Sequence, residues 1–376
     1  MTLQRLSGDP RQAEHWCRQL ASSAELTRVL LLLAGTATAA VPGISAAGST
    51  PESRRFTAAA DAELLLLGPS QPRPHALPPL PAGVSPALIA RVVVEQLGLE
   101  PLVVDAGAAV PPAVPHLQLG LPPARCLSTG QAMPEAQVQQ LLALGRRWGQ
   151  QLARRQQPLL LAECVPGGTS TAQAVLQGLG LAAAGLVSGS LREPAHALKA
   201  ELVRCGLAAA QLPAPASAAA LLAAVGDPMQ PLAAGLVQAA ALAGLPVLLA
   251  GGSQMVAVLA LALELTAEAD RPQLASRAAI ATTAWVAAEP SSNLVLLLEQ
   301  LQHRWGCEPL AFAAGLRFGS CRSPQLQAFE QGFVKEGVGA GGLAALWQLS
   351  GRSPQALAHA CDQACAVLHG SQGFAS

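Results

Sequence analysis

Tyrosine is absent from this 376-residue chain, and aromatic residues make up only 3% of it. Alanine, leucine and glycine must therefore fill the core, which brings helices and strands close together. Charged residues are also scarce, at 12%, and the 23 Lys and Arg balance the 23 Asp and Glu. A chain without excess positive charge has no long-range attraction for polyanions, which argues against nucleic acids and acidic membrane surfaces as main partners.

The N-terminus has no features of a secretion signal. Residues 1–10 are polar and mixed, without the apolar segment that a signal peptide carries. The eight cysteines are scattered, and no CxxC pair is present. Cys361 and Cys365 are one helical turn apart, but no second pair completes a tetrahedral zinc site. We therefore expect a cytoplasmic protein with reduced thiols and with no metal or other cofactor.

One apolar stretch, residues 231–252, has about the length of a membrane-spanning helix. It consists mostly of Ala and Gly, contains Gln238 and is interrupted by Pro246. A buried helix, a short turn and a buried strand explain this pattern better, and a second long apolar span is absent. We expect no membrane association.

Short apolar runs that end in Gly-rich turns alternate with helical segments along the chain. Continuous apolar runs are typical of strands that are buried on both faces of a parallel sheet. The runs predicted to be strands are residues 29–35, 64–68, 101–104, 158–163, 246–251 and 278–282. Helix-length Ala/Leu segments include residues 134–155, 217–225 and 256–267. This alternation predicts an α/β fold, a three-layer Rossmann-like parallel sheet with helices on both faces.

The chain ends and a proline-rich segment interrupt this alternation. We expect residues 26–320 to form a large α/β nucleotide-binding domain. Residues 1–25 and 321–376 read as helical, and we expect them to pack together as a smaller lobe that carries Glu336. Residues 71–87 contain six prolines, which predicts an extended surface connection or a lid over a site.

The segment after residues 158–162 is a candidate anion site, because it reads ECVPGGTSTA from Glu163 to Ala172. Two glycines and three hydroxyl residues at a helix start leave free N–H groups pointing outward, and the helix dipole favours negative charge. An ordinary Gly turn with a Thr or Ser cap explains the same residues equally well. No Lys follows the glycines, so the segment is not a Walker A loop.

Further small-residue turns follow other predicted strands. Gly251 and Gly252 come after residues 246–250, and residues 35–38 and 42–48 come after Ala34. Each turn alone is a weak signal. Because the carboxyl ends of parallel strands meet at one edge of a sheet, the turns together could line a cleft for a phosphorylated ribose.

Glu336 is the most specific candidate for chemistry. It lies between Lys335 and a glycine-rich run at residues 337–342. A substrate can reach a carboxylate on such a loop, and partial burial would raise its pKa and make it a general base. On spacing alone, a solvated glutamate on a flexible loop, paired with Lys335, is the favoured explanation.

Taken in order, these segments resemble the nicotinate-nucleotide:dimethylbenzimidazole phosphoribosyltransferases, and in particular a divergent archaeal and cyanobacterial branch of that family. The similarity extends from about residue 29 to about residue 345. Residues 34–36 with 43–45 resemble the family's AGDHG…GVS, residues 163–172 its EMGIGNTTTA, residues 246–252 its PVLVDGF, residues 288–290 its SAEPGH and residues 336–340 its EGTGA. The two segments around Glu163 and Glu336 are the most specific.

The resemblance implies an enzyme that moves ribose 5-phosphate from nicotinate mononucleotide to a benzimidazole or purine base. The product would be an α-riboside 5-phosphate for the lower ligand of a cobamide. It implies Glu336 as the catalytic base. The substrate-binding residues would be Glu163, Gly167, Gly168, Thr169, Ser170, Thr171, Ser45, Gly251, Gly252, Gly337 and Gly339. The pyridinium leaving group is already charged, so neither a metal nor another cofactor is needed.

Three departures from the family pattern bear on the substrate. Residues 36–37 replace the family's Asp-His, residues 250–251 its Asp-Gly, and residues 333–334 stand where it has an Arg. A changed base substrate would explain them, and so would a non-catalytic protein that binds a nucleotide or cobamide precursor. A sugar-phosphate isomerase would need a His or a second acid in the cleft, and no glycine turn carries a His. A neutral Ala/Leu-rich surface makes a homodimer the expected assembly.

Overall fold

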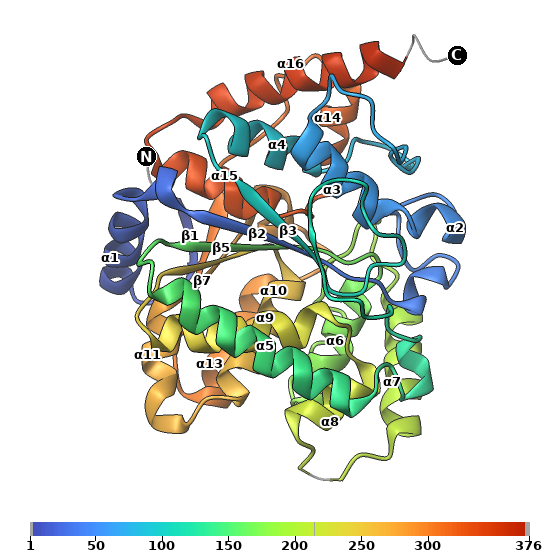
Figure 1. Ribbon diagram of the computed structural model, residues 1–376, viewed down its shortest axis with the longest axis vertical. Coiled ribbons are helices and arrows are strands. Elements are labelled where there is room, and N and C mark those ends of the chain that lie inside the picture. The colour runs from blue at the N-terminus through green and yellow to red at the C-terminus, as the bar shows by residue number, and fades with distance from the viewer. Residues whose placement is uncertain (1–2, 214, 373–376) are drawn as a thin grey trace.

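The computed structural model describes residues 3–213 and 215–372. Within them an eight-stranded sheet lies between two layers of helices (Figure 1). The strands are β1 Gln4–Ser7, β2 Arg28–Leu33, β3 Pro101–Asp105, β4 Leu117–Gln118, β5 Leu159–Cys164, β6 Val247–Ala250, β7 Ala278–Thr283 and β8 Leu310–Ala314.

The α-helices have these bounds: α1 Pro10–Ala21, α2 Pro51–Arg54, α3 Thr57–Leu67, α4 Ala87–Gln96, α5 Glu135–Ala153, α6 Gly168–Gly178, α7 His196–Ala210, α8 Ala218–Val225, α9 Met229–Leu242, α10 Ser253–Glu264, α11 Arg271–Arg277, α12 Ala284–Ala287, α13 Leu294–Trp305, α14 Pro324–Glu330, α15 Ala340–Leu349 and α16 Pro354–Gln372. Short 3₁₀ helices occur at Ala24–Leu26, Ala37–Ala40, Leu127–Thr129 and Glu268–Asp270.

The strand order is β1-β8-β7-β6-β5-β2-β3-β4. Strands β2 to β8 pair in parallel, and β1 pairs antiparallel with β8. The chain builds outward from β2 through β3 to β4, and then from β5 through β6 and β7 to β8. The direction of winding therefore switches between β2 and β5, and in open α/β sheets ligands bind beyond the carboxyl ends of the strands at such a switch point.

Two hydrophobic cores cover the two faces of the sheet. Leu30 and Leu32 of β2 point into the core beneath α5, α6, α9, α10 and α13, whereas Leu31 and Leu33 point into the core with α3, α4, α15 and α16. Figure 1 shows the same two helical layers on opposite sides of the strands. The predicted α/β fold with helices on both faces is confirmed.

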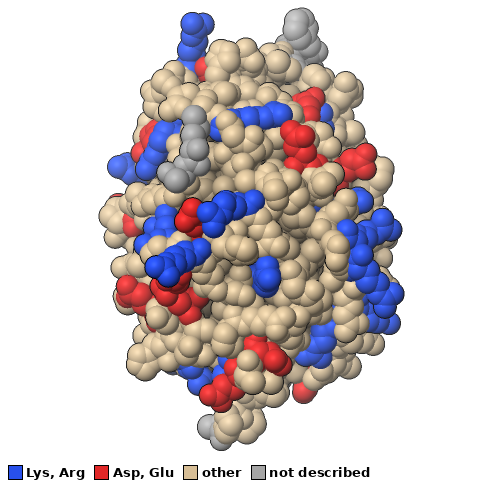
Figure 2. Space-filling model, turned by 90° about the vertical axis from the view of Figure 1, so that its left-hand side faces the viewer, with Lys and Arg blue, Asp and Glu red and all other residues tan. Residues whose placement is uncertain are grey.

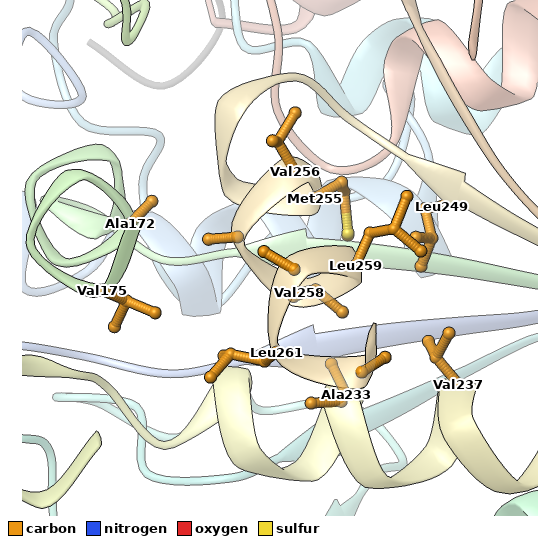
Figure 3. Close-up of a cluster of buried hydrophobic side chains, with 14 of the residues drawn as sticks. Ala172, Val175, Ala233, Val237, Leu249, Met255, Val256, Val258, Leu259 and Leu261 are labelled. Carbon is orange, nitrogen blue, oxygen red and sulfur yellow. The ribbon is translucent and has the colours of Figure 1, made fainter. Parts of the chain in front are cut away.

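Helix α10 is buried on every side. Figure 3 shows Leu259 of α10 next to Leu249 of β6 and Leu261 above α9, with Ala172 and Val175 of α6 to one side. The mostly alanine and leucine composition allows this, because small side chains let helices approach closely. The packing confirms that small residues take the place of aromatic ones in the core.

The apolar stretch at residues 231–252 forms most of α9, a turn and β6, as predicted. Both elements are buried in the core beneath the sheet. Among residues 3–213 and 215–372, no helix combines the length and hydropathy needed to cross a membrane.

One predicted strand is wrong. Residues 64–68 belong to the end of helix α3, and Gly68 ends it with a φ of 83°. All residues from Thr57 to Leu65 are buried, so the helix has no polar face that would mark its period. A short apolar run cannot be assigned to a strand or a buried helix by periodicity alone. The predicted strands at 29–35, 101–104, 158–163, 246–251 and 278–282 match β2, β3, β5, β6 and β7.

The division into two structural units stays a prediction. Strand β1, from the N-terminal segment, forms the antiparallel edge of the sheet beside β8. Helix α16 packs on α4 and α15, so the C-terminal segment covers one face of the large domain.

Candidate functional site

A cleft of about 270 Å³ opens at the carboxyl edge of the sheet. Segments at the ends of three strands line it, namely residues 45–47 after β2, 163–169 from the end of β5 into α6, and 252–254 after β6 and into α10. Residues of the proline-rich segment also line the cleft, as do residues 188–190 and 334–337. Segments that are far apart in the sequence therefore meet where the winding of the sheet switches.

The structure places most of the predicted site residues on this cleft. Those that line it are Ser45, Glu163, Gly167, Gly168, Thr169, Gly252, Glu336 and Gly337. Ser170, Thr171, Gly251 and Gly339 lie behind the wall. The Thr171 hydroxyl donates at 2.5 Å to the carboxylate of Asp227, which caps α9, so Thr171 joins α6 to α9. Their roles toward a substrate stay predictions.

The carboxylate of Glu336 is half-buried and held by four donors. Its Oε1 accepts from the N–H groups of Gly341 at 2.9 Å and Gly337 at 3.3 Å. Its Oε2 accepts from the Thr282 hydroxyl at 2.9 Å and the Thr283 N–H at 3.0 Å. Burial raises the pKa of Glu336, and these hydrogen bonds oppose that rise. The result is a fixed carboxylate of raised basicity at the cleft.

The start of α15 can approach Glu336 only because residue 341 is glycine. A Cβ at Gly341 would lie 2.2 Å from the carbonyl carbon of Thr282 and 2.4 Å from Glu336 Oε2. Any larger residue would push the first turn of α15 away from β7. The glycine-rich sequence after Glu336 is thus explained by close packing rather than by loop flexibility.

The backbone on both sides of Glu336 is strained. Val334, Lys335 and Val338 have φ values of 66°, 60° and 53°, in a region that residues other than glycine rarely adopt. The Lys335 N–H donates to the Phe333 carbonyl at 2.8 Å and the Glu336 N–H to the Val334 carbonyl at 2.7 Å, which makes two successive three-residue turns. Such strain persists only where the surroundings enforce it, and it is often found at functional sites.

A buried ion pair holds this segment in place. The Lys335 ammonium donates to Glu289 Oε1 at 2.6 Å and to the Leu191 carbonyl at 2.7 Å, and Lys335 is 1% exposed. The Thr283 hydroxyl donates to the Lys335 carbonyl at 2.7 Å. The solvated Lys335–Glu336 pair considered from spacing alone is therefore wrong, because the ammonium is buried against Glu289. Residues 288–290 resemble a family turn, but nothing in the sequence paired Glu289 with Lys335.

Glu163 lies beside Glu336, directly before the last residue of β5. Its Oε2 accepts from the Val165 N–H at 3.0 Å, and its carbonyl accepts from the Val338 N–H at 3.0 Å. Burial, and then the negative charges of Asp227 and Glu336, raise the pKa of Glu163 to about 8. At neutral pH the Glu163 carboxyl is thus mostly protonated and can donate a hydrogen bond.

We expect Glu163→Gln to reduce the loss of stability at alkaline pH. The pKa of Glu163 is higher in the folded state than its ordinary value of 4.5, so the neutral carboxyl favours the folded state. This contribution to stability is complete at pH values below 4.5. That contribution is lost as pH rises through about 8. Glutamine mimics the neutral form at every pH, so the Tm of the variant should rise relative to the wild type from pH 5 to pH 9. Parallel Tm curves in thermal unfolding would contradict this, and the exposed Glu299→Gln serves as the unchanged control.

Gln254 is a site residue that the sequence did not reveal. A Cβ at Gly168 would lie 2.0 Å from Gln254 Oε1, so the Gln254 amide packs directly on the start of α6 and a larger residue there would displace it. Gln254 lines the cleft, and its buried amide oxygen has no hydrogen-bond partner within the described part of the chain. An unpaired buried acceptor is costly, so a ligand hydroxyl or N–H would gain from meeting it.

Two buried lysines place positive charge beside the cleft. The Lys199 ammonium donates to the Ser188 carbonyl at 2.8 Å. Burial lowers the pKa of Lys199 to about 8, the charge of Glu289 opposes this, and Lys335 adds to it. Both ammonium groups lie behind residues 188–190, which line the cleft: Lys199 donates to the Ser188 carbonyl and Lys335 pairs with Glu289.

Two predictions concerned His and Cys residues. The predicted glycine turns contain no histidine, but His369, near the end of α16, lines the cleft. Cys361 and Cys365 are free and buried in α16. Among the residues that the structure describes, no group of three or more His, Cys, Asp or Glu is placed to hold a metal ion.

Sequence comparisons found a family model and relatives that match this chain. A family model described as phosphoribosyltransferase matches residues 87–287. A UPF0284 protein of Parasynechococcus marenigrum strain WH8102 is 52% identical over 93% of this chain and 89% of its own length. A UPF0284 protein of Gloeobacter violaceus is 47% identical over 94% of this chain and 91% of its own.

Solved structures share the fold. CobT from Thermus thermophilus superposes with a TM-score of 0.57 at 19% identity, covering 96% of this chain and 95% of that one. A second structure, of the nicotinate-nucleotide-dimethylbenzimidazole phosphoribosyltransferase from the same organism, gives a TM-score of 0.58 at 19% identity, covering 96% of this chain and 92% of that chain. The resemblance inferred from the residues is confirmed.

Proposed function

Because this chain belongs to the phosphoribosyltransferase family, we propose that it transfers ribose 5-phosphate from nicotinate mononucleotide to an aromatic base. The product is an α-riboside 5-phosphate, a precursor of the lower ligand of a cobamide. The observation that carries the proposal is Glu336, whose carboxylate has a raised pKa and is held at the cleft by four donors. A pentosyltransferase of this type needs one such base.

The proposed reaction needs only a proton acceptor. The pyridinium nitrogen of nicotinate mononucleotide already carries a positive charge, so the bond to C1′ breaks with its electron pair passing to that nitrogen. A ring nitrogen of the acceptor base attacks C1′ from the opposite face and inverts it. The attacking nitrogen is the unprotonated one, and the N–H proton of the other ring nitrogen of the base passes to Glu336. Nicotinate, the α-riboside 5-phosphate and one proton are the products.

The cleft offers groups for each part of the nucleotide. In the proposal the phosphate meets the N–H groups of Gly167 and Thr169 at the start of α6, whereas the Gly168 N–H donates to the Val165 carbonyl at 2.9 Å. The protonated carboxyl of Glu163 and the free amide oxygen of Gln254 contact ribose hydroxyls. Ser45, Gly252 and Gly337 border the acceptor base, and Ser170, Thr171, Gly251 and Gly339 shape the wall from behind.

One assay tests the proposal. The protein is incubated with nicotinate mononucleotide and a panel of benzimidazoles and purines, and nicotinate and the riboside phosphate are measured by liquid chromatography and mass spectrometry. We expect equal amounts of both products with at least one base. Tight binding of nicotinate mononucleotide without release of nicotinate would contradict it and favour the non-catalytic alternative.

Two further expectations belong to this proposal, a homodimer and a cytoplasmic location. Figure 2 shows one face on which Lys, Arg, Asp and Glu are scattered between uncharged residues. Leu26 and Phe56 are exposed to 59% and 40%.

A further inference from the structure

One end of the cleft is walled by the proline-rich segment. Leu77, Pro78, Pro79, Leu80, Val84 and Pro86 line it. Apolar side chains of this kind favour a flat, apolar ligand, since pockets for small molecules bury most of the ligand surface against such walls. Within the proposed function this end is the place for the acceptor base.

The catalytic segment closes the same end. A Cβ at Gly337 would lie 2.9 Å from the Pro86 side chain, and a Cβ at Gly83 would lie 2.9 Å from the Val334 side chain. The residue after Glu336 therefore packs directly on the lid. A base held by the lid is adjacent to Glu336, as proton transfer requires.

Asp61 lies at this end and has no catalytic role so far. It projects from α3, is 4% exposed and lines the cleft together with Ser85 and Cys164. The Ser85 hydroxyl donates to its Oδ1 at 2.6 Å, and the Cys164 thiol, a weak donor, lies 3.4 Å from its Oδ2. No Lys, Arg or His in the described ranges pairs with it.

This carboxylate has unused acceptor capacity. Two carboxylate oxygens offer about four acceptor sites, and only one strong donor meets them. A buried carboxylate without sufficient partners is costly, so such groups are retained where a partner arrives. Burial raises the pKa of Asp61 to about 6, which leaves the group mostly ionised, and hence an acceptor, at neutral pH.

We propose that Asp61 selects acceptor bases that carry a hydrogen-bond donor, such as an amino group, on the ring edge away from the attacking nitrogen. The inference rests on the proposed function, because it names the class of base that the same site accepts. A base with methyl groups on that edge would cover the carboxylate and leave the acceptor sites that Ser85 does not fill buried without a donor. Sites built to bind a polar group reject analogues that lack it by large factors.

The test compares two bases of nearly equal size, 5-aminobenzimidazole and 5-methylbenzimidazole. We expect the wild-type protein to use the amino base with at least about 100-fold higher kcat/KM. In Asp61→Asn that preference should fall to about 10-fold or less, because a neutral amide is a weaker acceptor. Ser85→Ala is the matched control: it removes the neighbouring donor, keeps the carboxylate and should keep the preference.

The outcomes separate the two proposals. Turnover of both bases at equal efficiency by the wild-type protein would leave the phosphoribosyl transfer intact and overturn the role of Asp61. Failure of every base to release nicotinate would instead overturn the proposed function. In that case calorimetric binding of the two benzimidazoles to the wild-type protein still tests Asp61, since equal affinities would contradict it and a preference for the amino base would support it.

Discussion

Glu336→Gln is expected to lower kcat by about 10²- to 10⁴-fold, while the affinity for nicotinate mononucleotide stays nearly unchanged. The amide cannot accept the proton from the attacking base. It keeps the size of the side chain, so the cleft keeps its shape. The measurement combines steady-state kinetics of nicotinate release with calorimetric binding of the nucleotide. A variant with wild-type kcat would remove Glu336 from the mechanism.

The four donors around Glu336 provide a sharper control. All four donors point at the carboxylate oxygens of Glu336. In Glu336→Gln the amide nitrogen, itself a donor, must therefore face two of these donors, either Gly341 and Gly337 or Thr282 and Thr283. Unfolding of Glu336→Gln must therefore be measured separately from its activity. Thr282→Val removes one donor and leaves the carboxylate. Because that hydrogen bond lowers the pKa of Glu336, the acidic limb of kcat/KM against pH should move to higher pH in Thr282→Val. An unchanged limb would contradict the base assignment.

Lys335→Met is expected to destabilise the fold by about 3–5 kcal/mol, because it leaves the Glu289 carboxylate buried without its partner. The two side chains of this pair are only 2% and 3% exposed, so solvent cannot take over the role of the ammonium. Urea unfolding measures the loss of stability. We also expect a fall in kcat with little change in KM, since the strained turns at residues 334–336 lose the contact that fixes them.

The double variant Lys335→Met with Glu289→Gln separates the charge from the packing. Removal of both partners abolishes the uncompensated charge, so the double variant should be more stable than Lys335→Met alone. The exposed pair Arg18–Glu14 is the matched control, with side chains exposed to 68% and 67%. Arg18→Met should change stability little, because exposed ion pairs contribute little. Equal losses in the single and double variants would show that the charge is not the cause.

Much of the fold follows from local sequence. The runs at residues 158–163 and 246–251 are strands because continuous apolar residues suit a sheet that is covered on both faces. Their glycine turns predicted the edge where the cleft opens. The strand predicted at residues 64–68 is wrong because α3 is buried on all sides, Asp61 and Glu63 included, so its apolar end shows no helical period. The strand β8, with the sequence LAFAA, was not predicted because short alanine-rich runs suit helices as well.

The residues by themselves also identified the family and singled out Glu336, through the order of the strand-end segments. What only the tertiary structure decided is how these segments meet. Thr282 and Glu336 are 54 positions apart, Lys335 and Glu289 are 46 apart, and Asp61 and Ser85 are 24 apart. In each pair, the two residues lie on loops or elements that end at the same edge of the sheet. Their spacing in the sequence does not show that they meet there. Packing decides which residue pairs with a buried charge. For that reason the sequence suggested Glu336 as the partner of Lys335, whereas in the structure the partner is Glu289.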